Sequence, residues 1–311
     1  MAGNRNIIAF MNGGLGNQAF QYIFIRYVEI KYGVSCVIDD SLFYVDNVPH
    51  NGYELGKLFN IKHDMLSSHY DEDTWKKMLS ERRGGYSPAQ VLKDHGMDLH
   101  MVTDLNNIHF SGPVYKLDKL GELIRSGSKD IYLHGYWILP KFFRKYAGII
   151  GKELSFEKAP ALEGKNAELL KQIASDKNSV CIHIRRGDMA DLGWCAKPEY
   201  FKNAIQTVER KVKRANYYLF SDDLDWCNEN AAKLGLDGIK DRLTVISGNN
   251  GPDAWKDLEL MTECRHFVSD RSSFSYLAYC LRNDRRSIII SRLHYSFGKR
   301  ISYRIKKLIK H

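Results

Sequence analysis

The sequence predicts an α/β protein with two Rossmann-like domains, each built around a parallel sheet. Its 311 residues suit two domains of about 150 residues better than one. The N-terminal segment follows a strand, glycine turn, helix and strand pattern, and the second half alternates apolar runs with helical patterns. Such alternation is typical of parallel strands covered by helices.

The N-terminal pattern is a βαβ unit, with an apolar strand at 7–11 and a glycine turn at 12–16. A helix at 18–32 and a strand at 34–38 complete the unit, so the turn lies at the carboxyl end of a strand. The pattern between residues 51 and 130 is weak, and we expect only scattered helices there.

The C-terminal half carries the clearer pattern. It predicts strands at 180–184, 217–220, 243–246, 266–269 and 287–291. It predicts helices at 160–176, 198–214, 224–234, 252–262 and 272–281. We therefore expect an N-terminal domain at 1–155, a C-terminal domain at 156–291 and a basic tail helix at 292–311, with a cleft between the domains where the strand ends point.

The excess positive charge is confined to the C-terminus. Nine Lys and Arg residues follow Asp284 without any Asp or Glu, and subtracting them from the total of 46 leaves 37 basic against 37 acidic residues. A protein that tracks a phosphate backbone usually spreads basic groups over a binding face. The neutral body therefore argues against nucleic acid as a partner.

Apolar runs and cysteines favour a cytoplasmic chain. The longest purely apolar stretches, 7–11 and 288–290, are far shorter than the roughly 18 residues of a transmembrane helix. The N-terminus does not have the pattern of a signal peptide. The six cysteines form no C-x-x-C pair, so we expect reduced, mostly buried thiols and no zinc site.

The glycine turn and the helix after it match a dinucleotide-binding pattern. Gly14 and Gly16 begin a G-x-G-x-x-A sequence, and Asp39 follows at the distance of a ribose-binding acid, so an NAD(P)-dependent oxidoreductase is one interpretation. Asn17 and Gln18 add amide side chains that can hydrogen-bond sugar hydroxyls or phosphate oxygens. An ordinary turn with a capping asparagine is the third interpretation.

Two arginines end the first strand of the C-terminal half. Strand alternation sends His183 and Arg185 to one face and Arg186 to the other, before the chain turns at Gly187. Guanidinium groups at the carboxyl end of a parallel strand form a strong anion site, because each can hold a phosphate through two charge-assisted hydrogen bonds. For Arg186, a salt bridge to Asp188 is the alternative.

Two further strand ends carry polar residues. Ser221 and Asp222 follow one strand. The next two acids, Asp223 and Asp225, could bind a divalent cation or could cap a helix, and we favour the helix cap. The segment 269–275 lies between a strand and a helix. Its hydroxyl and N–H groups suit a phosphate, or serve as a helix cap without a ligand.

Together these segments resemble the bacterial α-1,2-fucosyltransferase family, of glycosyltransferase family 11 type. The resemblance rests on four blocks in the order of that family, at 13–22, 183–188, 220–223 and 272–275. It implies a GT-B type α/β fold with two Rossmann-like domains facing a cleft. It implies GDP-β-L-fucose as the donor, a terminal galactose of a glycan as the acceptor, an inverting α-1,2 transfer, and neither metal nor cofactor.

The resemblance also implies contacts with the donor. His183 and Asp257 would contact guanine or ribose, and Arg185 would be the main diphosphate ligand. Asn17 and Gln18 would reach the fucose or the β-phosphate. The remaining expected donor-site residues are Gly14, Gly16, Arg186, Ser221, Asp222, Ser272, Ser273 and Phe274.

We expect Arg185, Asn17 and Asp188 to be catalytic. Arg185 and the helix N–H groups would stabilise the charge that develops on the leaving diphosphate. Asp188 is the candidate base for the acceptor hydroxyl, on its closeness to Arg185 in the sequence alone. The chain departs from the family pattern at Met189, at 270–271 and at 276–277, which leaves the acceptor and the linkage open.

The basic tail has two interpretations. Its apolar residues fall on one helical face and its basic residues mostly on others, which suits peripheral contact with an anionic membrane that carries a lipid-linked acceptor. Alternatively, the tail helix packs back on the fold. The apolar residues are Phe297, Ile301, Ile305, Leu308 and Ile309.

Overall fold

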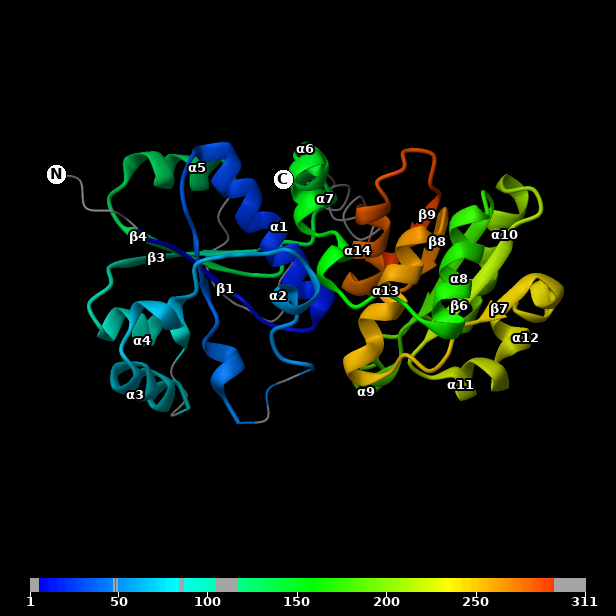
Figure 1. Cartoon of the computed structure of the whole chain (residues 1–311), viewed down its shortest axis with the longest axis horizontal. Helices are drawn as coiled ribbons and strands as arrows, with labels where there is room; N and C mark the ends of the chain where they lie inside the picture. The colour runs from blue at the N-terminus through cyan, green and yellow to red at the C-terminus, as the bar shows by residue number, and fades with distance from the viewer. Residues whose placement is uncertain (1–5, 47, 49, 84–86, 105–116, 294–311) are drawn as a thin grey trace, which may run out of the picture. The chain divides into compact units, whose positions relative to one another are not determined.

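The computed structural model describes residues 6–46, 48, 50–83, 87–104 and 117–293. The chain divides into two compact units, Met1–Ala159 and Pro160–His311, and each contains its own sheet (Figure 1). The sequence placed this boundary at residue 155. The apolar tail residues 297–309 lie outside the described residues.

The N-terminal sheet is parallel and has the strand order β2-β1-β4-β3. Its strands are β1 (Ile7–Phe10), β2 (Val37–Asp39), β3 (Leu99–Thr103) and β4 (Asp130–His134). Helix α1 (Leu15–Tyr32) joins β1 to β2, which confirms the predicted βαβ unit. The expectation of only scattered helices between 51 and 130 is wrong, because β3 lies there and β4 begins at its end.

Helices cover both faces of this sheet. The helices after α1 are α2 (Leu55–Leu58), α3 (Glu72–Arg83), α4 (Pro88–Asp94), α5 (Leu117–Ser126), α6 (Pro140–Lys145) and α7 (Ala147–Glu153). Helices α1 and α5 lie on one side of the sheet, and α3 and α4 lie on the other (Figure 1). Ile8 and Phe10 of β1 share a buried apolar cluster with Trp75 and Leu79 of α3 and with Val91 of α4.

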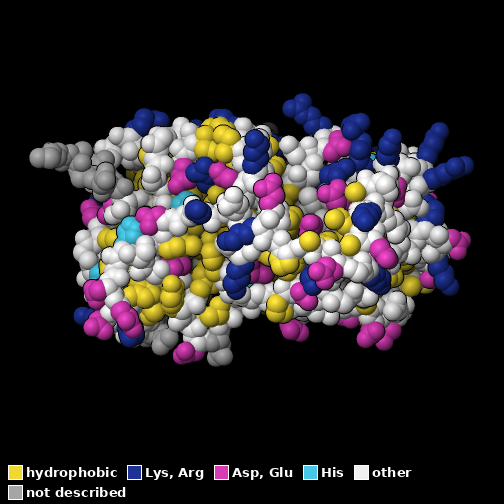
Figure 2. Space-filling view, in the orientation of Figure 1, with side chains coloured by type: hydrophobic (Ala, Val, Ile, Leu, Met, Phe, Trp, Pro, Cys, Tyr) yellow, Lys and Arg dark blue, Asp and Glu magenta, His cyan; other side chains and the backbone are white. Residues whose placement is uncertain are grey.

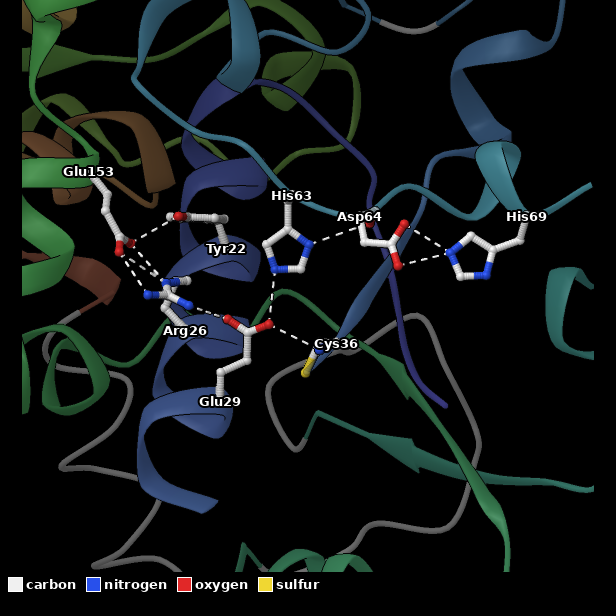
Figure 3. A network of polar contacts seen from close by, with 8 residues as sticks. All are labelled: Tyr22, Arg26, Glu29, Cys36, His63, Asp64, His69 and Glu153. Atoms are coloured by element: carbon white, nitrogen blue, oxygen red, sulfur yellow. Dashed lines mark hydrogen bonds and ion pairs between the residues drawn. The ribbon is translucent and has the colours of Figure 1, made fainter. Parts of the chain in front are cut away.

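A polar network runs along one side of α1 and links it to neighbouring segments (Figure 3). Glu153 of α7 accepts hydrogen bonds from Tyr22 Oη at 2.9 Å and from the Arg26 guanidinium. Glu29 pairs with Arg26 and contacts His63 Nε2 at 3.1 Å. Burial of Glu29 raises its pKa, but hydrogen bonds from His63 and from a backbone N–H outweigh this effect and leave the pKa lowered. The network connects α1 to α7 and to the segment that carries His63.

The C-terminal sheet is also parallel and has the order β7-β6-β5-β8-β9. Its strands are β5 (Ser179–Ile184), β6 (Asn216–Ser221), β7 (Leu243–Val245), β8 (His266–Ser269) and β9 (Ile289–Ser291), as the sequence predicted. The chain runs outward from β5 through β6 to β7, then crosses back to β8. The order therefore reverses between β5 and β8, and such switch points are where doubly wound sheets bind ligands.

The helices of this unit are α8 (Gly164–Ser175), α9 (Gly187–Asp191), α10 (Pro198–Lys211), α11 (Leu224–Glu229), α12 (Ala231–Leu234), α13 (Ala254–Glu263) and α14 (Ser273–Arg282). Val180, Ile182 and Ile184 of β5 pack against α10 and α12. The opposite face is covered by α8, α13 and α14, of which α13 packs against both of the others (Figure 1). All six cysteines are free thiols and five are buried, which confirms that prediction.

Candidate active site

Three strand ends of the C-terminal unit converge at the switch point. His183 near the end of β5 is in register with Ser269 at the end of β8 and with Phe220 of β6. The segments that follow these strands carry the polar blocks found in the sequence. Segments 183–188, 221–223 and 269–275 therefore form one site, although up to about 90 residues separate them along the chain.

The two adjacent arginines have different partners. Arg185 Nη1 lies 2.8 Å from Asp222 Oδ2, and about a third of the Arg185 side chain is exposed. Arg186 Nε donates to Asp223 Oδ2 at 2.9 Å, and its guanidinium lies 3.8 Å from the centre of the Trp226 ring. Arg186 is thereby fixed against α11, so the structure does not support its expected contact with the donor. Arg185 stays the predicted diphosphate ligand.

His183 links β5 to the beginning of α14. Its Nδ1 forms a 3.0 Å hydrogen bond with Ser275 Oγ, and its ring lies 6.1 Å from that of Phe274. Burial, together with the nearby Arg185 charge, lowers the pKa of His183 to about 3. The imidazole is therefore neutral at physiological pH, and one ring nitrogen donates while the other accepts.

Helix α14 begins beside these groups. Ser272 occupies its N-cap position and is buried, but its side chain makes no capping hydrogen bond. The first turn contains no acidic residue, and Ser273 and Phe274 are half-buried there. A helix of ten residues presents N–H groups and a partial positive charge at this end, which favours an anion.

Asp257 lies in the first turn of α13, on the face of the sheet that α14 also covers. Asn249 Nδ2 donates to Asp257 Oδ1 at 2.7 Å, and Asn249 exchanges two hydrogen bonds with Asn166 of α8. Burial raises the pKa of Asp257 to about 6, although the Asn249 hydrogen bond opposes the rise. A desolvated carboxylate with a fixed orientation is suited to accept hydrogen bonds from a bound ligand.

The acids after β6 cap a helix, as predicted. Asp223 is the N-cap of α11, and its Oδ1 accepts a hydrogen bond from Trp226 N–H at 3.1 Å. In the part of the chain that the structure describes, no three His, Cys, Asp or Glu side chains are grouped to hold a metal. Ser221 Oγ donates to Ile184 O at 2.8 Å and accepts from Asp223 N–H, so it joins two strand ends. A donor contact for Ser221 is not supported.

The remaining expected site residues follow β1 in the N-terminal unit. Gly14 is the half-buried N-cap of α1, and Gly16 is buried in the first turn. Asn17 is half-buried, and its amide covers Gly13, where an added Cβ would lie 2.6 Å from Asn17 Nδ2. Gly13 has φ +76°, so only glycine fits well at this turn.

Gln18 is completely buried and serves the fold. Its Nε2 donates to Gly13 O at 2.8 Å and to Gly52 O at 2.7 Å, and its Oε1 accepts from Glu54 N–H at 2.9 Å. The structure does not support the expected contact between Gln18 and the donor, because both ends of the amide already bond backbone groups. Gly16 is also buried, and its contact with the donor stays a prediction.

The oxidoreductase interpretation fails at Asp39. Its carboxylate is fully buried and accepts hydrogen bonds from Tyr132 Oη at 2.6 Å and from Ser41 N–H at 3.0 Å. It cannot reach the ribose hydroxyls that the acid of a dinucleotide site must bind. Asp188 lies in α9, and its side chain is outside the described part of the structure.

Sequence reasoning missed three residues of the site. Ser275 was recognised within its block but was given no role, although it binds His183. Asn249, in a loop eight residues earlier, orients Asp257 through a hydrogen bond. The feature of the sequence that could have pointed to Asn249 is a polar residue shortly before a helix that contains a buried acid. Asp270, directly after β8, was seen only as a departure from the family pattern, and it lies at the centre of a cluster described below.

The charges on the visible surface agree with the neutral body of the chain. Basic and acidic side chains are interspersed over the C-terminal unit on the face that Figure 2 shows, without a continuous basic patch. Among the helices that the structure describes, none is long and apolar enough to cross a membrane.

Comparisons with known proteins identify the family of the chain. The model of glycosyl transferase family 11 matches residues 100–305. The chain is 23% identical over 286 residues to an α-1,2-colitosyltransferase of Escherichia coli, covering 89% of this chain and 88% of that protein. It is 22% identical over 300 residues to the O-antigen biosynthesis glycosyltransferase WbnK of Escherichia coli, covering 90% and 92% of the two chains.

Among solved structures, the fold is similar to that of NodZ, a Bradyrhizobium α-1,6-fucosyltransferase co-crystallised with GDP. The TM-score is 0.53 at 13% identity, over 89% of this chain and 92% of that one. The fold is thus α/β, of GT-B type. Since the family model covers most of the sequence and includes the switch point of the C-terminal sheet, the chain belongs to glycosyl transferase family 11.

Proposed function

We propose that this glycosyltransferase moves L-fucose from GDP-β-L-fucose to a terminal galactose hydroxyl of a glycan, with inversion to an α-1,2 linkage. The observation that carries the proposal is that Arg185 follows β5 while α14 begins after the neighbouring strand β8, so both lie at the carboxyl ends of strands beside the switch point. A guanidinium and a helix N-terminus at one place favour a diphosphate. Relatives named as α-1,2-colitosyltransferase and galactoside α-(1,2)-fucosyltransferase support the linkage.

The buried acid of α13 suits the guanine base. Guanine presents two adjacent N–H donors, and the Asp257 carboxylate has one oxygen fixed by Asn249 and can accept them. His183 is neutral and held by Ser275, so it can hydrogen-bond the nucleoside without adding charge. In this proposal Arg185, Ser272, Ser273 and Phe274 surround the diphosphate, and the base lies on the side of α13.

The reaction is a displacement at the anomeric carbon of fucose. The acceptor oxygen forms its bond on one face while the bond to the β-phosphate oxygen breaks on the other, and GDP leaves with an added negative charge. Arg185 and the α14 N–H groups stabilise that charge more in the transition state than in the ground state. The acceptor hydroxyl gives its proton to a base, for which Asp188 stays the candidate, and Asn17 stays the candidate contact for the fucose.

A donor and acceptor screen tests the proposal. The protein is incubated with labelled GDP-fucose and a set of galactose-terminated oligosaccharides, and products are analysed for linkage. GDP affinity is measured in parallel by calorimetry, with NAD(H) as the comparison. We expect tight GDP binding, no NAD(H) binding and an α-1,2-fucosyl product; a folded protein that does not bind GDP would refute the proposal.

The closest alternative is a different sugar on the same nucleotide. The colitosyltransferase relative gives this alternative its basis. A colitosyl donor is therefore included in the screen beside GDP-fucose, and the ratio of kcat/KM values assigns the sugar. Linkage analysis of the product distinguishes α-1,2 from other fucosyl linkages.

A further inference from the structure

Three donors surround the buried carboxylate of Asp270, which directly follows β8. Its Oδ2 accepts a hydrogen bond from Ala196 N–H at 2.6 Å. Its Oδ1 accepts one from Arg271 N–H at 2.6 Å and lies 3.0 Å from Arg292 Nη1. Only 2% of the side chain is exposed. A buried carboxylate with a cation and two backbone donors has a fixed position, because any of these groups left unpaired would be costly.

Two of these donors, Ala196 and Arg292, come from segments distant from Asp270 in the sequence, and the third belongs to Arg271, the next residue in the chain. Ala196 lies in the loop after α9, Arg271 in the turn before α14, and Arg292 at the end of β9. Arg292 Nη1 also donates to Trp194 O at 3.0 Å, which ties the end of β9 to the same loop. Asp270 therefore connects the carboxyl ends of β8 and β9 with the chain that follows the two arginines.

Both halves of the proposed phosphate site are attached to this carboxylate. On one side, Cys195 precedes Ala196, and its Sγ lies 3.6 Å from Arg185 O, so the loop lies against the backbone that carries the Arg185 guanidinium. On the other side, Arg271 is joined directly to Ser272, the N-cap of α14. Asp270 therefore bonds to the loop beside Arg185 and to the turn before α14.

We propose that Asp270, with Arg292 as its counter-ion, is a positioning residue that sets the distance between Arg185 and the N-terminus of α14. The proposal rests on the proposed function, because that spacing matters only for an anion bound between the two. Asp270 itself is covered by protein and would not touch the donor.

The expected kinetic effect follows from this geometry. Asn in place of Asp270 offers one acceptor oxygen instead of two, and its NH2 group would face an N–H donor. The loop and the turn then move apart, and a misplacement of 1 Å can lower turnover by about a hundredfold. We expect Asp270→Asn to lower kcat by at least about tenfold. The KM for the donor should change far less, since the guanine contacts of Asp257 and His183 are untouched.

The control is a similar ion pair at the opposite edge of the same sheet. Asp284 accepts a hydrogen bond from Arg286 N–H at 2.9 Å and pairs with Arg265, which directly precedes β8, at 3.1 Å. Its side chain is 16% exposed. Asp284→Asn therefore removes comparable chemistry and lowers stability, but it should leave kcat close to the wild-type value.

Each variant is assayed for kcat, donor KM, GDP affinity and melting temperature. Hydrogen exchange of the backbone amides at 194–197 and 270–273 is measured without ligand. The expected result is a selective fall in kcat, with faster exchange in both segments, for Asp270→Asn but not for Asp284→Asn. Equal kcat for the two variants, at wild-type GDP affinity, overturns the proposal.

Two further variants guard against a failure of Asp270→Asn to fold. Arg292→Gln removes only the counter-ion, and we expect a smaller fall in kcat that Arg292→Lys largely restores. If the kcat values of both variants equal that of the wild type, the positioning role is contradicted. If the wild type neither binds GDP nor transfers fucose, the proposed function fails, while the hydrogen exchange results still show whether Asp270 couples the two segments.

Discussion

Arg185 Nη1 lies 2.8 Å from Asp222 Oδ2, and the other oxygen of that carboxylate accepts a hydrogen bond from Arg186 N–H at 2.7 Å. Gly187 follows with φ +22°, and an added Cβ there would lie 2.7 Å from Asp222 Oδ2. Asp222 therefore orients the guanidinium and shapes the turn beside it, and glycine leaves room for the carboxylate. This arrangement makes Asp222 an orienting residue for Arg185.

Replacement of Arg185 by Lys should lower the transfer rate severely. Lys keeps the charge but loses the planar fork, so it cannot pair with Asp222 and hold the leaving diphosphate in the same way. Loss of one preorganised donor to developing charge typically costs about a hundred- to a thousandfold in turnover. We expect at least about a hundredfold loss in kcat, with a smaller loss in GDP affinity.

Arg186→Lys is the matched control for that variant. Its guanidinium pairs with Asp223 and stacks on Trp226, so the change should reduce stability more than turnover. Steady-state kinetics with folding checked by circular dichroism compares the two. A nearly normal rate for Arg185→Lys would remove the centre of the proposed mechanism.

Gln18→Ala should destabilise the N-terminal unit without changing GDP affinity. The substitution leaves the carbonyls of Gly13 and Gly52 and the N–H of Glu54 without their partner. Each unsatisfied buried group costs about 1–3 kcal/mol, so we expect a loss of at least about 2 kcal/mol in the free energy of unfolding. Urea denaturation measures it. A stable variant with a raised donor KM would instead restore the sequence-based role of Gln18 at the donor.

Asp257→Asn should stabilise the free protein, and the gain should depend on pH. The native pKa of Asp257 is raised from 3.8 to about 6, so the native state binds this proton more tightly than the unfolded state. The stability from that proton is complete below about pH 4 and is lost as pH rises through 6. The loss at neutral pH is on the order of 3 kcal/mol. Asn does not titrate and avoids this loss. The melting temperatures of wild type and Asp257→Asn should therefore diverge between pH 4 and 7 and converge below pH 4. A difference in melting temperature that does not vary with pH contradicts the prediction.

The same carboxylate should make GDP binding sensitive to acid. If guanine N–H groups donate to ionised Asp257, wild-type GDP affinity should fall as pH drops below about 6. Asp257→Asn should bind GDP weakly at every pH, in spite of its higher stability. Calorimetric titration from pH 5 to 8 measures both proteins, and an unchanged affinity in the variant would place guanine elsewhere.

Transfer should not require a divalent metal. Arg185 and the N–H groups of α14 offer positive charge at the proposed diphosphate site, and Asp223 is already used as the cap of α11. Activity should therefore be unchanged after treatment with EDTA. Loss of transfer in EDTA that Mn²⁺ or Mg²⁺ restores would contradict the proposed site.

Deletion of residues 299–311 tests the membrane interpretation of the tail. The deletion removes six Lys and Arg residues, each worth about 1 kcal/mol near an anionic surface, and it retains Arg292, which is bound to Asp270. We expect weaker binding to vesicles that contain phosphatidylglycerol and unchanged activity on a water-soluble acceptor. Unfolding of the shortened chain, or unchanged vesicle binding, favours a tail that packs on the protein.

The architecture could largely be predicted from the sequence, because parallel strands covered on both faces form apolar runs. All strands of the C-terminal sheet were found in this way. β3 and β4 were missed because they contain residues such as His100, Tyr132 and His134, whose polar groups need partners that only the assembled unit supplies. Tyr132, for example, is buried in β4 through its hydrogen bond to Asp39.

The sequence also determined which residue types gather at the site, since each polar block directly follows a strand and the carboxyl ends of parallel strands share one edge. The tertiary structure alone decided their individual roles. Asn17 and Gln18 are neighbours with the same functional group, but helix geometry leaves one half-exposed and buries the other against Gly52 and Glu54. Asp270 and Arg292 meet because β8 and β9 pair side by side, a long-range contact that no local pattern encodes.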